Sequence, residues 1–135
     1  MTTKQKPKLP TSLERAKIAA KIAAENNGRN VVIMDLRGVT PTFDFFVIAS
    51  GTSRRQMHAI SEEIDAAFEK NLGDRRISIS GYQESMWIAL DYGDIVVHLF
   101  EPEKRGYYAL EELWGTGKVV PFNYEPNEKQ NEETV

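Results

Sequence analysis

The residues from Met86 to Glu101 read MWIALDYGDIVVHLFE, and this stretch decides the fold because it holds two apolar runs around a single turn. Two strands are predicted, at 86–91 and 95–100. They flank Tyr92-Gly93 and must therefore pair as an antiparallel hairpin. With a two-residue turn, Trp87 would lie opposite His98. A four-residue turn would change the pairing but leave every side chain on the same face.

Alternation along the two strands sorts their side chains into two sets. One set is aliphatic or methionine and is predicted to be core: Met86, Ile88, Leu90, Ile95, Val97 and Leu99. The other combines aromatic rings with carboxylates and an imidazole: Trp87, Ala89, Asp91, Asp94, Val96, His98 and Phe100. If helices cover the first face, the second is open to solvent or a partner. Exposed aromatic side chains beside a few polar groups are typical of interface anchors. Alternatively, the C-terminal tail or another strand buries Trp87.

The segments around the hairpin alternate between helical and strand patterns. Apolar residues recur at helical spacing after Ser12, a candidate N-cap, and again after Ser53, a second candidate. Residues 45–49 are all apolar, which is typical of a strand covered on both faces or of one central in its sheet. The expected elements are a helix from Ser12 to Asn26, strands at 31–36 and 43–50, a helix from Ser53 to Gly73, a strand at 76–82, the hairpin, and a helix between Pro102 and Gly115.

This order, α-β-β-α-β-β-β-α, predicts one α/β (α+β) domain with a mixed, mostly five-stranded sheet and helices mainly on one face. The crossover at 45–80 is expected to pair parallel strands. The predicted organisation is a flexible arm at 1–11, a folded domain at 12–115 and a polar tail at 116–135.

Composition narrows the functional classes. The chain of 135 residues has a net charge of −3 and a pI near 5.5, so it lacks the basic excess typical of proteins that bind phosphate backbones. It has no cysteine, which excludes disulfides, thiolate metal sites and cysteine nucleophiles. No apolar run approaches the length of a membrane span. A soluble cytoplasmic protein is expected.

Two features invite a catalytic interpretation. His98 lies near Asp91 and Asp94, but a metal centre needs at least three donors around one point, and the only other histidine, His58, is on a predicted helix. The segment SGTSRRQ (50–56) joins a strand to a helix, where backbone amides can bind anions. It matches no phosphate-binding signature, so a capped helix start is the simpler interpretation. We expect neither a metal nor another cofactor.

Three blocks of the chain resemble the ribosomal silencing factor family, also called Iojap-like or YbeB-like proteins. The blocks are FVIASGTSRRQ (46–56), WIALDYGDIVVHLF (87–100) and RGYYALEELW (105–114). The resemblance covers about residues 13–115. It implies a protein that is not an enzyme and binds the large ribosomal subunit through ribosomal protein L-fourteen. Bound there, family members block docking of the small subunit and lower translation when nutrients are short.

The resemblance also implies a set of contact residues. Those that match the family's blocks, together with Phe100 from the second face, are the predicted partner-binding residues: Trp87, Asp91, Tyr92, Asp94, His98, Phe100, Tyr107 and Tyr108. Arg55-Gln56 match an Arg-Gln pair for which a structural role is expected. Little direct contact with nucleic acid is expected, and the same aromatic face could support a homodimer of the free protein that opens when the ribosomal partner arrives.

The fold implied by the resemblance is similar to that of the nucleotidyltransferase superfamily, and a nucleotide-binding enzyme of that kind is the alternative function. Such enzymes need a pair of carboxylates on a strand to clamp magnesium. In this chain the acids at the corresponding distance, Glu62, Glu63 and Asp65, fall on a predicted helix. The superfamily's chemistry is therefore not expected.

Overall fold

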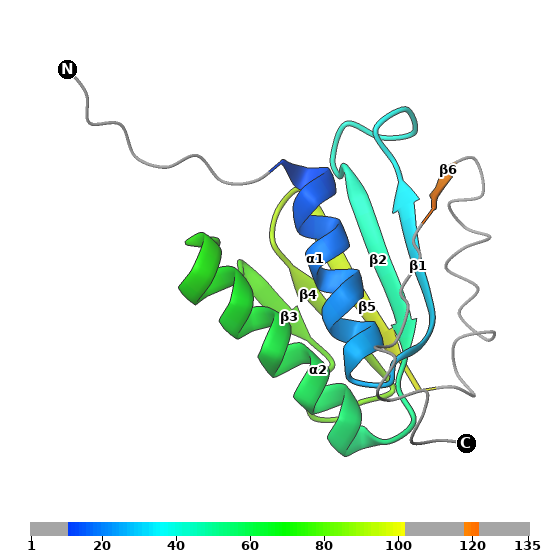
Figure 1. Ribbon diagram of the computed structural model, residues 1–135, viewed down its shortest axis with the longest axis vertical. Coiled ribbons are helices and arrows are strands. Elements are labelled where there is room, and N and C mark those ends of the chain that lie inside the picture. Colours follow the sequence, from blue (N-terminus) through cyan, green and yellow to red (C-terminus); the bar gives the residue numbers. More distant parts are fainter. Residues whose placement is uncertain (1–10, 102–117, 122–135) are drawn as a thin grey trace, which may run out of the picture.

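The computed structural model describes residues 11–101 and 118–121 (Figure 1). Its elements are α1 (Ser12–Glu25), β1 (Arg29–Asp35), β2 (Phe45–Ser50), α2 (Arg54–Ala66), the π-helix η1 (Ala67–Leu72), β3 (Ser78–Ser80), β4 (Trp87–Asp91), β5 (Ile95–Phe100) and β6 (Lys118–Val120). The predicted arm up to residue 10 and the predicted helix between Pro102 and Gly115 lie outside the described residues. No helix within the described ranges is long and apolar enough to cross a membrane.

Helix α1 begins one residue earlier than the predicted cap implies. Thr11, not Ser12, is the N-cap: its hydroxyl accepts from the backbone N–H of Glu14, and the Glu14 carboxylate accepts from the N–H of Thr11. This reciprocal pair is a capping box, which satisfies two amides that the helix leaves unpaired. The Ser12 hydroxyl instead donates to Asp44, 2.8 Å away, and so ties α1 to the start of β2.

Within the described residues, the sheet has six strands in the order β3-β4-β5-β2-β1-β6. Only β2 and β5 pair in parallel; the other neighbours are antiparallel. The predicted mixed sheet is confirmed, but β6, which pairs with β1, adds a strand that the polar composition of the tail did not predict. The expected direct pairing of β2 with β3, the strands at either end of the 45–80 crossover, is wrong. Strand β3 lies at the edge of the sheet, and β4 and β5 lie between β3 and β2.

Both described helices pack on one face of the sheet (Figure 1). Their apolar side chains and the inward side chains of β1, β2, β4 and β5 form the inner core. The opposite face carries a second group, the outer cluster: Met34, Leu36, Phe46, Ile48, Val96 and Phe100. All six residues of β2 are buried, and its five apolar residues alternate between the two groups. The predicted burial of this strand on both faces is confirmed.

The second helix and the strand after it differ from the sequence prediction at their ends. Ser53 caps α2 as predicted, and Gly73 ends η1 with a left-handed φ of 71°. The final turns are wound as a π-helix, which the spacing of apolar residues did not indicate. Strand β3 is limited to three residues, and Ile77, predicted to lie in it, is 68% exposed.

Candidate partner-binding site

The β4–β5 hairpin uses the longer of the two turns considered from the sequence. Asp91 lies opposite Val96, which leaves four residues in the connection, and Trp87 lies opposite Phe100. His98 therefore lies opposite Ala89, two residues away from the pairing that a two-residue turn predicts. Gly93 has a φ of 97°, and its N–H donates to the Asp91 carboxylate at 2.8 Å. This side-chain bond stabilises the wider turn.

The predicted sorting of the hairpin into two faces is confirmed because the longer turn keeps the same parity. Five of the predicted core residues lie in the inner core: Ile88, Leu90, Ile95, Val97 and Leu99. Trp87, Ala89, Val96 and Phe100 pack in or against the outer cluster. Met86 is one exception, since it precedes β4 and is 40% exposed, and Asp94 in the turn is another, since it pairs with Arg15 of α1.

The second face is less open than its composition suggested. Trp87 is half-buried, whereas His98 is 6% exposed and Phe100 is fully buried. The prediction of an open face is therefore wrong for His98 and Phe100. Phe46 of the neighbouring β2 contacts the His98 ring edge-on, with the ring centroids 4.5 Å apart. The outward side chains of the central strands build an apolar layer of their own, which the hairpin sequence alone could not indicate.

Trp87 is held in place by the two aromatic residues beneath it. Its indole Nε1–H donates to Nδ1 of His98 at 3.0 Å, and its ring stacks on Phe100 with centroids 5.1 Å apart. An indole N–H can only donate, so Nδ1 must accept and the proton of neutral His98 must be on Nε2. Within the described part of the chain, Nε2 has no hydrogen-bond partner. His98 and Phe100 thus position Trp87.

Burial lowers the pKa of His98 from 6.5 to about 4. The folded state therefore disfavours protonation of His98. It should keep its full stability above about pH 6.5 and lose stability as the pH drops from there to about 4. The difference between the His98 pKa values of the unfolded and folded states corresponds to about 3 kcal/mol of unfolding free energy. We expect urea unfolding to show this loss in the wild type between about pH 7 and 4.

The His98→Gln variant is the control, because glutamine can accept from Trp87 but does not titrate in this range. The stability advantage of the wild type over the variant should shrink by about 3 kcal/mol on acidification. A constant difference across this pH range would show that His98 is not held neutral by burial.

The three remaining hairpin residues of the predicted set have structural partners. Asp91 caps the turn through the hydrogen bond that its carboxylate accepts from the Gly93 N–H. Asp94 binds Arg15 of α1, with Nη2 and Oδ2 2.6 Å apart, and so faces the helices, not the second face where it was predicted. Tyr92 is buried in the inner core and donates to Asp65 at 2.8 Å. Burial, together with that hydrogen bond, raises the pKa of the Tyr92 hydroxyl.

Tyr107 and Tyr108, the last two predicted contact residues, lie outside the described residues. Among those that are described, no group of three or more His, Cys, Asp or Glu side chains is arranged to hold a metal ion. The contacts of His58 are with other residues than those around His98. Its Nε2 lies 2.8 Å from the Ser85 hydroxyl and 2.7 Å from the Tyr82 carbonyl oxygen.

The loop between β2 and α2 uses its polar groups internally. The backbone N–H and hydroxyl of Thr52 both donate to the Gln56 side chain, and Ser53 accepts from the Gln56 N–H at 3.1 Å. The Gln56 amide in turn donates to the carbonyl of Asn26 at 2.7 Å, which links α2 to the end of α1. The Thr52 and Gln56 amides of this loop are thus engaged, and the structural role expected of Gln56 is confirmed.

The acidic residues considered for a magnesium clamp lie on α2, as predicted. Each accepts a hydrogen bond from a different neighbour. Glu62 accepts from the Tyr82 hydroxyl at 2.6 Å, Glu63 accepts from Asn26, and Asp65 accepts from Tyr92 and forms an ion pair with Arg76. These contacts join α2 to the end of α1 and to the connections before and after β3 and β4, and they do not converge on one point.

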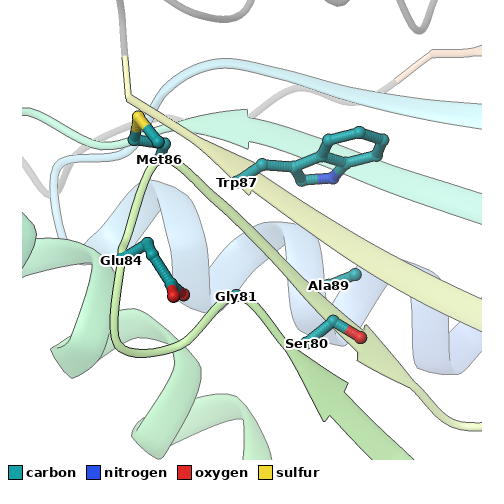
Figure 2. A pocket seen from close by; sticks show the side chains of 6 residues that line it. All are labelled: Ser80, Gly81, Glu84, Met86, Trp87 and Ala89. Atoms are coloured by element: carbon teal, nitrogen blue, oxygen red, sulfur yellow. The ribbon is translucent and has the colours of Figure 1, made fainter.

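A groove of about 440 Å³ lies beside Trp87 (Figure 2). It is lined by Ser80, Gly81, Glu84, Met86, Trp87 and Ala89. Trp87 and Ala89 come from β4, Ser80 ends β3, and the remaining three belong to the connection between these strands. Of this set, sequence reasoning selected only Trp87 as a contact residue. Glu84 and Met86 were missed because the alternating pattern placed Met86 in the core and gives no signal for a loop residue such as Glu84.

The comparisons with known proteins agree on one family. The family model described as "Ribosomal silencing factor during starvation" matches residues 9–135, which extends beyond the blocks noted in the sequence. The ribosomal silencing factor of Bacillus subtilis is 33% identical over 83% of this chain and 94% of its own length. The chloroplastic protein Iojap of Arabidopsis thaliana is 30% identical over 84% of this chain and 47% of its own length.

Solved structures show the same fold. A crystal structure of a Chromobacterium violaceum protein superposes with a TM-score of 0.75 at 28% identity, covering 86% of this chain and 95% of that one. A second, from Bacillus halodurans, has a TM-score of 0.68 at 32% identity, covering 82% and 96%. The α+β fold, the matched family model and the relatives lead to one assignment: this chain belongs to the ribosomal silencing factor family.

Proposed function

We propose that this protein acts in the cytoplasm, binds the large ribosomal subunit at ribosomal protein L-fourteen and sterically prevents the small subunit from joining. It would lower translation under nutrient limitation. The observation that carries the proposal is the match of nearly the whole chain to a family described as silencing ribosomes during starvation. The protein would act by occlusion and not by catalysis.

The contact surface we propose is the outward side of β4 around Trp87. An anchor residue binds more tightly when little freedom is lost on binding. The hydrogen bond from Trp87 to His98 and the stack on Phe100 fix the indole before a partner arrives. His98 and Phe100 would therefore contribute by positioning Trp87, while Asp91, on the same strand, would border the contact. Tyr92 and Asp94 would contribute through the shape of the turn.

Charge favours a protein partner over RNA on this surface. Among the described residues, the groove beside Trp87 has one ionisable side chain in its lining, the carboxylate of Glu84, and the whole chain is acidic. A surface of this sign repels phosphates, whereas RNA-binding surfaces gather lysine and arginine. Contact with a ribosomal protein, with little direct contact with ribosomal RNA, is therefore the arrangement we propose.

Trp87→Ala is expected to weaken binding to purified large subunits by at least about 30-fold, because losing an aromatic anchor costs about 2 kcal/mol or more. Co-sedimentation with large subunits measures the affinity, and an in vitro subunit-joining assay should show the matching loss of inhibition. Thermal unfolding monitors whether the variant remains folded.

Val119→Ala is the matched control, since Val119 is an apolar residue that is 67% exposed on β6, at the opposite edge of the sheet. It should bind like the wild type. Wild-type protein that fails to sediment with large subunits would refute the ribosomal proposal itself. Normal binding by folded Trp87→Ala would refute the proposed surface alone.

A further inference from the structure

In the part of the chain that the structure describes, the groove beside Trp87 has a mostly apolar lining and a single charged group. Met86, Trp87 and Ala89 supply the apolar side chains, and Glu84 supplies a carboxylate (Figure 2). Its volume of about 440 Å³ lies within the range of pockets that hold small ligands or single large side chains. A groove of this kind suits an occupant that is apolar along most of its length and cationic at one end.

Glu84 is exposed, and no ion pair or hydrogen bond involves its side chain among the described residues. Many other carboxylates of the fold are engaged by cations or by hydrogen-bond donors, as Asp65, Asp74 and Asp94 are. Glu84 is therefore a negative charge next to an apolar surface without a described counter-charge. A cation brought by a partner would complement it.

The loop that carries Glu84 is held by its neighbours. Ser85 is buried in a left-handed conformation with a φ of 59°, and its hydroxyl donates to the Tyr82 carbonyl at 2.9 Å. His58 of α2 stacks on the Tyr82 ring with centroids 3.9 Å apart, and its Nε2 lies within 2.8 Å of the Ser85 hydroxyl. These contacts fix the backbone on both sides of Glu84, so its carboxylate is offered from a preorganised loop.

We propose that this groove receives an arginine side chain of the protein partner, an inference that rests on the proposed function and specifies the chemistry of its binding surface. The aliphatic part of the arginine would lie on Met86 and Ala89, the guanidinium would contact the Trp87 indole, and its N–H groups would donate to Glu84. Arginine suits this site better than lysine because its planar, weakly hydrated guanidinium both stacks on aromatic rings and pairs with carboxylates. The carboxylate excludes a phosphate group from the same position.

A first experiment tests the groove without the ribosome. An acetylated, amidated tripeptide, Ala-Arg-Ala, is titrated at millimolar concentration while the indole N–H resonance of Trp87 is followed by NMR and assigned with Trp87→Phe. We expect a saturable shift, a weaker one with Ala-Lys-Ala, and none with Ala-Glu-Ala or a short RNA oligonucleotide. Absence of a saturable shift with the arginine peptide, or an equal response to RNA, overturns the inference.

A second experiment connects the groove to the large subunit. Glu84→Gln should weaken co-sedimentation roughly tenfold and Glu84→Lys further, as expected when a charged hydrogen-bond partner is removed or reversed. The matched controls are Glu25→Gln and Glu25→Lys, because Glu25 is an exposed carboxylate on α1. If the wild type binds and all four variants bind equally, the arginine site is refuted while the proposed function stands. A peptide response without subunit binding would support the site and refute the ribosomal function.

Discussion

Arg15→Ala is expected to lower the free energy of unfolding by about 4 kcal/mol, because it removes one partner of a buried ion-pair network. The Arg15 side chain is 7% exposed. Its Nη1 lies 2.8 Å from an Asp74 carboxylate oxygen, and its Nη1 and Nη2 lie 3.1 and 2.6 Å from the two carboxylate oxygens of Asp94. Burial alone would lower the pKa of Arg15, but its hydrogen bonds to Asp94 and Asp74 raise it.

The cost arises from the charges left behind. Without Arg15, the Asp74 carboxylate, which is 11% exposed, would lack its counter-charge in a poorly solvated site. The Asp94 carboxylate is 38% exposed, so water can partly replace its contact and this half of the network contributes less. The same change would release α1 from the end of η1 and from the β4–β5 turn, which Arg15 joins.

Urea unfolding at neutral pH measures the loss. Arg37→Ala is the matched control, because the Arg37–Asp35 pair has the same 2.8 Å contact but its arginine is 55% exposed. That variant should lose no more than about 1 kcal/mol. Similar losses in both variants would show that the Arg15 network is not a main source of stability.

Arg15 also illustrates what the sequence could not reveal. On the helical pattern it is one charged residue among the polar positions of α1. Its partners lie 59 and 79 residues away in the chain, and only the folded arrangement brings them together. The apolar residues of the same helix recur every three to four positions, and this local repeat indicates the helix and its buried side from the sequence alone.

The hairpin shows the same division between local and long-range information. The assignment of Trp87 and Leu90 to opposite faces depends on alternation alone and does not change with the length of the turn. Whether the second face is covered depends on the neighbouring strands. The apolar run of β2 indicated burial on both sides, but it gave no sign that β5 would be its parallel partner. The outer cluster and the burial of His98 follow from that pairing.

The candidate site was predictable only in its centre. Trp87 stood out as a large aromatic residue on a partly polar face, and the groove beside it includes that residue. The other walls come from the bend of the chain between β3 and β4, where Gly81 has a φ of 73°. The strand predicted at 76–82 runs through this glycine, so the sequence prediction misses the bend. It does not show how closely the backbone approaches β4 there.

Gly81→Ala is the second substitution with a large expected effect, about 4 kcal/mol in unfolding free energy. Forcing a non-glycine residue into the left-handed region costs about 1 to 2 kcal/mol. In addition, the new Cβ would overlap the carbonyl oxygen of Trp87 and lie 3.1 Å from its carbonyl carbon. Backbone cannot give way as a flexible side chain can, so the start of β4 must move, at a further cost of about 1 to 3 kcal/mol.

Gly73→Ala separates these two contributions, because Gly73 has nearly the same φ, 71°, but nothing lies within 4 Å of its added Cβ. It should lose only the conformational part, about 1 to 2 kcal/mol. Denaturant unfolding of both variants compares them directly, and the Trp87 indole resonance should move in Gly81→Ala alone because its backbone forms the contact. Equal losses in the two variants would mean that the approach of Gly81 to Trp87 does not constrain the groove. A larger loss at Gly81, with a displaced Trp87, would mean that one glycine sets both the start of β4 and the shape of the surface proposed to bind the ribosome.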